Sequence, residues 1–115
     1  MITGAHSIIY TRDPDGVRRF FKDVLELPSV DAGNGWLIFA LPPAEVAAHP
    51  TDGAGRHELY LMCEDIHATV AELSARAVEF AGPVREERWG SVTAIALPGG
   101  GELGLYEPKH PSPPH

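Results

Sequence analysis

The sequence predicts an α+β fold in which two tandem βαβββ modules form a cupped mixed β-sheet with the helices on the outside. The first observation is residues 57–80, where apolar and polar side chains alternate as in a strand and then recur at helical spacing. The second is the same pattern in residues 5–28. The third is spacing, because Asp13 and Asp65 can each cap a helix and follow their strands at the same distance. The same module therefore occurs twice.

In the first module we expect a strand, a helix and three further strands. The helix is predicted because apolar side chains recur at three- and four-residue steps behind Asp13, and because Pro14 suits the first helical turn. The Gly-Asn-Gly sequence at residues 33–35 predicts a tight turn. The strand after it has almost no polar residue, so we expect it to be covered on both faces. The expected elements are strand 5–11, helix 13–26, and strands 29–32, 36–41 and 44–49.

The second module repeats this order. Pro98 and the three glycines that follow it predict the turn before the last strand. The expected elements are strand 57–63, helix 65–77, and strands 79–88, 90–97 and 102–107. The first module then spans residues 1–50, the linker 51–56 and the second module 57–108. The proline-rich tail 109–115 is expected to be disordered.

Composition narrows the classes of function. A chain of 115 residues forms one domain, or two small modules that share one core. Its net charge of −7 argues against nucleic acid or an anionic membrane as a partner. Cys63 is the single cysteine, so a disulfide within the chain is excluded. The sequence shows neither a signal-peptide pattern nor an apolar run of membrane-spanning length, and we expect a cytoplasmic protein.

The strand faces turned away from the helices predict a ligand cavity. Residues 6, 8 and 10 share one such face, and residues 58, 60 and 62 share another. Two sheets that curve toward each other would enclose a space lined by aromatic and thioether groups, which suits a small organic molecule. The alternative is that these side chains belong to a filled core. The candidate substrate-binding residues are Tyr10, Tyr60, Met62 and Tyr106.

A metal site is the second prediction for this cavity. His6 and Glu58 occupy matching positions at the starts of their strands, and both side-chain types bind divalent metals. Because three or four protein ligands are usual, Glu102 at the start of the last strand is the candidate third ligand. The alternative is a hydrogen bond between His6 and Glu58, or two partly solvated polar ends. The residues leave both interpretations open.

The repeated module resembles the vicinal oxygen chelate superfamily, which includes glyoxalase I, bleomycin resistance proteins and extradiol dioxygenases. In the first module the matching motifs are HSIIYTRD and the helix VRRFFKDVLELP. In the second they are HELYLMCEDI and the closing GGGELGLYEP. The resemblance covers residues 4–109 and implies a ligand in the cleft between the modules.

The resemblance also implies where ligands would lie and what the chain would do. Metal-using members take ligands from the first and last strands of each module. His6 and Glu58 fall on the first-strand positions, whereas the last-strand positions, usually Glu, fall on Gly104 and near Val46. The implied function is a metal-dependent lyase, isomerase or dioxygenase with Zn, Ni, Mn or Fe. The alternative is a metal-free protein that sequesters a small molecule or drug. A homodimer is implied in both cases, because modules in this superfamily often pair between chains.

Overall fold

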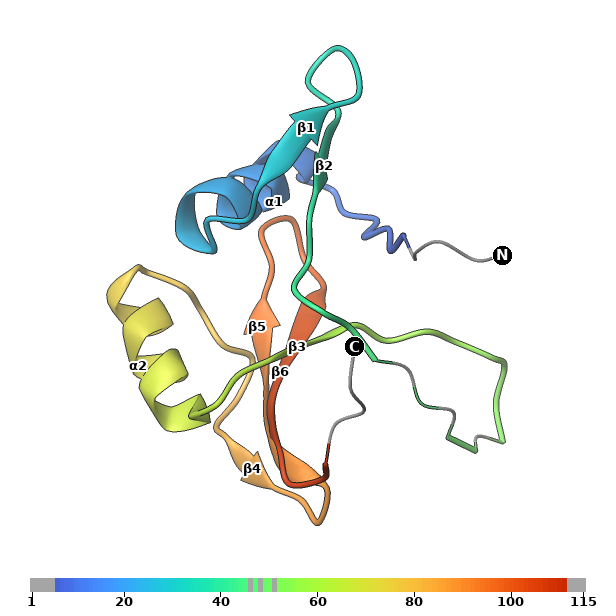
Figure 1. Cartoon of the computed structure of the whole chain (residues 1–115), viewed down its shortest axis with the longest axis vertical. Helices are drawn as coiled ribbons and strands as arrows, with labels where there is room; N and C mark the ends of the chain where they lie inside the picture. Colours follow the sequence, from blue (N-terminus) through green and yellow to red (C-terminus); the bar gives the residue numbers. More distant parts are fainter. Residues whose placement is uncertain (1–5, 46, 48, 51, 112–115) are drawn as a thin grey trace.

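A four-stranded mixed β-sheet lies at the centre of the chain in the computed structural model (Figure 1). The strands run in the order β3 (Tyr60–Met62), β6 (Glu102–Pro108), β5 (Gly90–Ala96) and β4 (Arg85–Glu86). β3 pairs in parallel with β6, and the other neighbours pair antiparallel. The structure describes residues 6–45, 47, 49–50 and 52–111.

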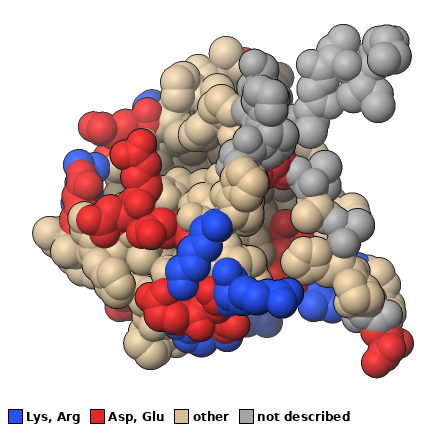
Figure 2. All heavy atoms as spheres, turned by 60° about the horizontal axis from the view of Figure 1, so that its bottom comes forward, with Lys and Arg blue, Asp and Glu red and all other residues tan. Residues whose placement is uncertain are grey.

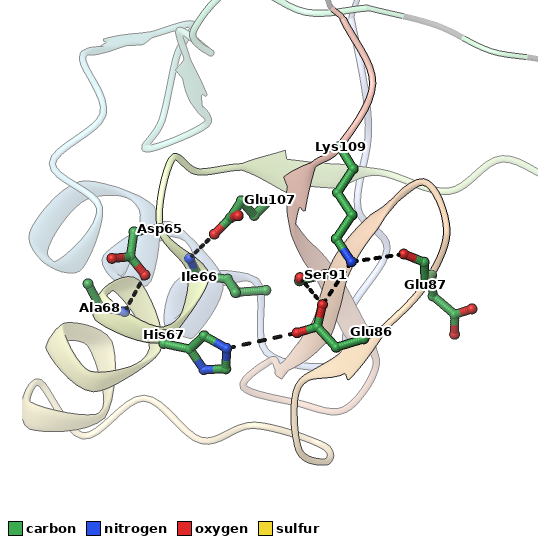
Figure 3. A network of polar contacts seen from close by, with 9 residues as sticks. All are labelled: Asp65, Ile66, His67, Ala68, Glu86, Glu87, Ser91, Glu107 and Lys109. Atoms are coloured by element: carbon green, nitrogen blue, oxygen red, sulfur yellow. Dashed lines mark hydrogen bonds and ion pairs between the residues drawn. The ribbon is translucent and has the colours of Figure 1, made fainter.

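Helix α2 (Ile66–Ala75) packs beside this sheet and is fixed at its first turn. The Asp65 side chain accepts a hydrogen bond of 3.1 Å from the Ala68 N–H, as expected of a helix cap. The Glu107 carboxylate on β6 accepts a second bond, of 2.9 Å, from the Ile66 N–H (Figure 3). Ile66 itself is fully buried, so the start of α2 is tied to the sheet by both polar and apolar contacts.

The first module supplies a bent helix and a hairpin. Helix α1 (Pro14–Arg19) begins at Asp13, whose side chain accepts a bond from the Gly16 N–H, and continues as the π-helical turn η1 (Phe20–Val24). Strands β1 (Ser29–Asp31) and β2 (Leu37–Phe39) then pair antiparallel. All three residues of the turn between them, 33–35, have positive φ, which explains the Gly-Asn-Gly sequence.

One hydrophobic core joins the two modules. Phe20 from η1 and Leu73 from α2 are both buried against three side chains near the β5–β6 turn. Partly buried residues of both modules pack against this core, among them Phe21 and Leu61. The three residues at the turn are Ile95, Leu97 and Leu103. The helices of both modules therefore contribute to one core, and the expected α+β class with a mixed sheet is confirmed.

The expected first strand is wrong over its described residues, 6–11. This segment is irregular because none of the described strands pairs with it, and pairing is what makes an alternating sequence a strand. Its polar anchor is Thr11, whose hydroxyl donates a 3.0 Å hydrogen bond to the carbonyl of Pro98. Thr11 in turn accepts a bond from the N–H of Asp13, which joins this segment to α1.

Three other expected strands are corrected in detail. The strand at 36–41 is limited to β2 and is not covered on both faces, since Ile38 is 43% exposed in a sheet of two strands. The strand at 79–88 shrinks to β4 and an isolated bridge between Phe80 and Ile95, because Gly82 and Pro83 interrupt the pairing. At 44–49 the described positions are irregular, and residues 46 and 48 lie outside the described residues.

Two further expectations concern the ends of the modules. The boundaries at residues 50 and 108 stay predictions. Residues 112–115 of the predicted disordered tail lie outside the described residues.

Within the part of the chain that the structure describes, no helix is long and apolar enough to cross a membrane.

Candidate functional site

The face of the four-stranded sheet opposite α2 contains a hollow of about 720 Å³. Its floor is made of the small residues Gly104 and Ala94, which pair with each other across β6 and β5. Gly104 also pairs with Tyr60 across β6 and β3. Val92 lies one step along the same face, since it pairs with Tyr106. A volume of this size is typical of sites for small organic ligands.

Two walls of the hollow come from different modules of the chain. Residues 7–9 of the N-terminal segment form one wall, and residues 81–83 before β4 form another. The charged side chains among the lining residues are those of Glu58, Arg85 and Glu102, with His57 beside them. The hollow is therefore apolar at its floor and polar at its rim.

Gly104 explains how the Tyr60 ring is placed. A Cβ atom added at Gly104 would overlap three atoms of that ring, so the ring lies directly on the glycine backbone. A larger residue at this position would push the ring away. In the resemblance described above, position 104 is where a metal-binding Glu is usual. Here an aromatic ring occupies the space in front of it.

Three aromatic rings meet at this end of the sheet, and we call Tyr60, Trp89 and Tyr106 the aromatic corner. The ring centroids are 5.7 Å apart for Tyr60 and Tyr106, 5.8 Å for Trp89 and Tyr106, and 6.4 Å for Tyr60 and Trp89. The corresponding interplanar angles are 88°, 68° and 82°. Such edge-to-face contacts stabilise aromatic clusters beyond their buried area.

A carboxylate holds the hydroxyl of Tyr60. The Tyr60 hydroxyl donates a 2.8 Å hydrogen bond to Glu58, which also accepts a 3.2 Å bond from the Arg56 guanidinium. The bond from Tyr60, followed by that from Arg56, lowers the pKa of Glu58 below its usual value. The same bond raises the pKa of Tyr60. Glu58 is therefore a carboxylate engaged by two donors of its own chain.

The hydroxyl of Tyr106 has a similar partner from the first module. It donates a 3.0 Å hydrogen bond to Glu45, whose side chain is 17% exposed. Burial first, and then this hydrogen bond, raise the pKa of Tyr106 to about 12. His110 lies next to both, with its Nε2 atom 3.6 Å from the Glu45 carboxylate. Glu45, Tyr106 and His110 thus connect the first module, β6 and the tail.

We expect Tyr106 to ionise well above the usual pH range of tyrosine in an alkaline titration. Its folded-state pKa of about 12 exceeds the ordinary value of 10.0, so its contribution to stability is fully present below pH 10.0 and is lost as pH rises toward 12. Near-ultraviolet absorbance of the phenolate measures the titration. The Tyr106→Phe variant should lack the step near pH 12, and an unchanged curve for that variant would contradict the assignment.

The turn that carries Trp89 is held by polar contacts (Figure 3). The Lys109 ammonium donates to the Glu86 carboxylate at 2.9 Å and to the Glu87 carbonyl at 3.2 Å. The Lys109 N–H donates to the Trp89 carbonyl at 2.9 Å, and Ser91 donates to Glu86 at 2.6 Å. The bonds from Ser91 and then Lys109 lower the pKa of Glu86. These contacts fix the backbone on both sides of Trp89.

On this side of the molecule, basic side chains form ion pairs with acidic ones. On the face brought forward in Figure 2, basic side chains lie directly against acidic ones. The ion pairs between Lys109 and Glu86 and between Arg85 and Glu87 belong to the residues around β4. Exposed pairs of this kind contribute little to stability, so we assign them a positioning role.

The structure brings together part of the predicted binding set. Tyr60, Met62 and Tyr106 share the face of the sheet that carries the hollow, because Met62 pairs with Tyr106 and Tyr60 with Gly104. Tyr10 does not join them and is 90% exposed, since the segment that carries it forms no strand.

The predicted metal ligands are placed differently from one another. Glu58 and Glu102 both line the hollow, whereas His6 is exposed and does not line it. Among the described residues, no group of three or more His, Cys, Asp or Glu side chains is placed to hold a metal ion. The described donor set therefore does not fit a metal centre, and the site at His6, Glu58 and Glu102 stays a prediction.

Sequence reasoning missed two members of the site, Trp89 and Glu45. Trp89 precedes Gly90, and the register that pairs Gly90 with Pro108 brings the tryptophan to the end of β6 beside Tyr106. A register prediction for the β5–β6 hairpin would have found it. Glu45 lies 61 residues from Tyr106, and local sequence carries no signal for that contact.

Comparison with solved structures shows which fold this is. An antibiotic-binding protein, TnmS3 from Streptomyces sp. CB03234, is 24% identical with a TM-score of 0.66, covering 95% of this chain and 99% of that one. A glyoxalase/bleomycin resistance protein/dioxygenase superfamily member from Sphaerobacter thermophilus is 21% identical with a TM-score of 0.66, covering 92% and 98%. A lactoylglutathione lyase from Agrobacterium tumefaciens is 15% identical with a TM-score of 0.62, covering 91% and 92%.

These likenesses define the class of structure. The chain has the vicinal oxygen chelate fold, the fold of the glyoxalase/bleomycin resistance protein/dioxygenase superfamily. No protein-family model matches the sequence, and no curated protein matches it. The fold hosts both binding proteins and enzymes, so the function has to be argued from the site.

Proposed function

We propose that this protein binds a small organic molecule in the hollow between Tyr60, Gly104 and Val92, without a metal ion. The observation that carries the proposal is the Tyr60 ring lying on Gly104, which puts an aromatic surface where a metal-binding carboxylate would stand. A floor of small side chains beside the Tyr60 ring suits an apolar or aromatic ligand body. The likeness to an antibiotic-binding protein supports sequestration of a drug-like compound.

A second candidate is metal-dependent chemistry of the lyase or dioxygenase type. It is favoured by the presence of Glu58 and Glu102 on the lining of one hollow. Such an enzyme would need a third ligand, and Zn, Ni, Mn or Fe would polarise neighbouring oxygens of the substrate. Elemental analysis of the purified protein separates the candidates, because the enzyme requires stoichiometric metal that is lost in a His6→Ala variant.

The first proposal is tested by a ligand-detected NMR screen of aromatic fragments. The protein is dialysed against a chelator before the screen, so that every hit is independent of metal. We expect hits that lose at least roughly thirtyfold in affinity in a Tyr60→Ala variant, as for other aromatic anchors. Binding that survives this substitution unchanged would remove the proposed site, and hits that appear after metal is restored would favour the second candidate.

We also propose that the chain forms a homodimer. Val30, Trp36 and Ile38 lie on one face of the β1–β2 hairpin and are 66%, 67% and 43% exposed. The guanidinium carbon of Arg18 lies 5.0 Å from the centroid of the Trp36 ring. Most of the Trp36 surface is nevertheless exposed. A patch of this kind is typical of a protein interface, and a two-fold axis would bring the same patch of both copies into contact.

A cytoplasmic location stays a prediction of the sequence.

A Trp36→Glu variant is therefore expected to be a monomer. A carboxylate placed in an apolar interface is buried without a partner, which is unfavourable. We therefore expect association to weaken by at least about tenfold. Sedimentation velocity at micromolar concentration measures the state. An Ala71→Glu variant, which adds the same charge at an exposed position of α2, should sediment like the parent chain. A parent chain that is already monomeric would contradict the proposal.

A further inference from the structure

We propose that the aromatic corner and the two carboxylates at its tyrosines select ligands that carry an organic cation, such as a protonated or quaternary amine. The inference rests on the proposed function and names the ligand class of the same site. It is drawn from the arrangement of Tyr60, Trp89 and Tyr106 and from the partners of their polar groups.

The rings of the aromatic corner pack edge to face, so that the edge of one ring lies against the face of the next. Each pair is tilted by 68° to 88°, and the centroids are 5.7 to 6.4 Å apart. The faces of aromatic rings carry partial negative charge and attract cations within about 6 Å of the centroid. Tyr60 and Trp89 are 37% and 41% exposed, so part of each ring is open to a ligand. Of the three rings, Tyr60 is the one that lines the hollow.

Both tyrosines of the aromatic corner hold a carboxylate next to their rings. Tyr60 donates to Glu58, and Tyr106 donates to Glu45. Each tyrosine hydroxyl stays protonated. The bond to Glu58 raises the pKa of Tyr60, and burial followed by the bond to Glu45 raises the pKa of Tyr106. The corner therefore combines aromatic faces with two carboxylates, and both attract a positive charge.

The chain already places one cation-forming group beside this corner. The His110 ring lies 6.1 Å from the Tyr106 ring, tilted by 34°, and its Nε2 atom is 3.6 Å from the Glu45 carboxylate. When protonated, His110 makes the kind of contact that we propose for a ligand amine. An aromatic cation can therefore be accommodated against Tyr106 and Glu45 in the geometry of this fold.

The remaining charges around the hollow leave a negative balance. Arg56 is bonded to Glu58, and Arg85 forms an ion pair of 3.4 Å with Glu87. Glu102 adds a further carboxylate to the lining. An anionic ligand would meet these carboxylates, whereas a cationic one would be attracted by them. The carboxylates concerned are Glu45, Glu58, Glu87 and Glu102.

The test compares three probes of the same size and different charge: benzylammonium, benzyl alcohol and benzoate. NMR titration follows the indole N–H signal of Trp89 in the full chain with Trp36→Phe, so that one tryptophan reports. We expect benzylammonium to bind about tenfold more tightly than benzyl alcohol, and benzoate to bind more weakly than both. The preference should fall several-fold in Glu45→Gln and Glu58→Gln, and should fall with added salt.

A Glu72→Gln variant is the matched control. Glu72 forms an ion pair with Arg76, and its substitution makes the same change of charge away from the aromatic corner. Equal binding of benzylammonium and benzyl alcohol would overturn the inference and leave the proposed function standing. An ammonium preference that Glu72→Gln reduces as much as Glu58→Gln would overturn it too, because general charge would then explain the preference. Absence of binding by all three probes overturns the inference, and an empty fragment screen beside it would overturn the proposed function as well.

Discussion

A Gly104→Leu variant is expected to lose ligand binding while keeping its fold. The leucine side chain would occupy the space that the Tyr60 ring now fills, so the ring must leave the floor of the hollow. Displacing an aromatic anchor should reduce affinity by at least roughly thirtyfold, and overpacking should lower the free energy of unfolding by about 1–3 kcal/mol. Affinity for the hits of the fragment screen and chemical unfolding measure the two effects.

The control for this variant is Gly55→Ala. Gly55 lies in the linker, and a Cβ added there meets no atom within 4 Å. Its affinity and stability should match those of the parent chain. If Gly104→Leu keeps full affinity, the ligand does not lie against Tyr60, and the proposed placement of the site is wrong.

A Phe20→Ala variant is expected to lose about 3–5 kcal/mol of unfolding free energy, as large-to-small substitutions of buried aromatic residues do. Phe20 is 7% exposed and packs with Leu73, Ile95 and Leu103 of the second module. Since domains of this size are stable by about 5–15 kcal/mol, this is a large share of the total. The loss should appear in one cooperative transition that involves both modules.

Ile8→Ala is the comparison, because Ile8 is 62% exposed and should change stability by no more than about 0.5 kcal/mol. Urea unfolding followed by circular dichroism and by tryptophan fluorescence tests both statements. Trp36 reports on the first module and Trp89 on the second. Two separate transitions, with Phe20→Ala affecting the first alone, would show that the modules do not share a core.

Local sequence predicted the elements whose signals are local. Asp13 and Asp65 cap helices as expected, because a capping side chain bonds to a backbone group two or three residues away. The glycine-rich turns at 33–35 and 99–101 adopt positive φ as expected. The long strands β5 and β6 follow the predicted alternation because they pair with each other across a short turn.

Long-range partners explain what the sequence did not predict. Residues 6–11 alternate as a strand does but are irregular, because a strand needs a neighbour and sequence pattern does not supply one. Tyr10 is exposed for the same reason. The aromatic corner depends on the contact of Trp89 with Tyr106 and of Tyr106 with Glu45, which join distant segments.

The most direct test of this account is the position of a bound fragment in metal-free protein. Nuclear Overhauser effects between a screening hit and assigned protein protons provide it. The account predicts contacts to Tyr60, Val92 and Ala94 in protein dialysed against a chelator. It would be contradicted by binding that requires a metal, or by contacts to Phe20, Val78 and Leu97, which line a second hollow of about 410 Å³ between the modules.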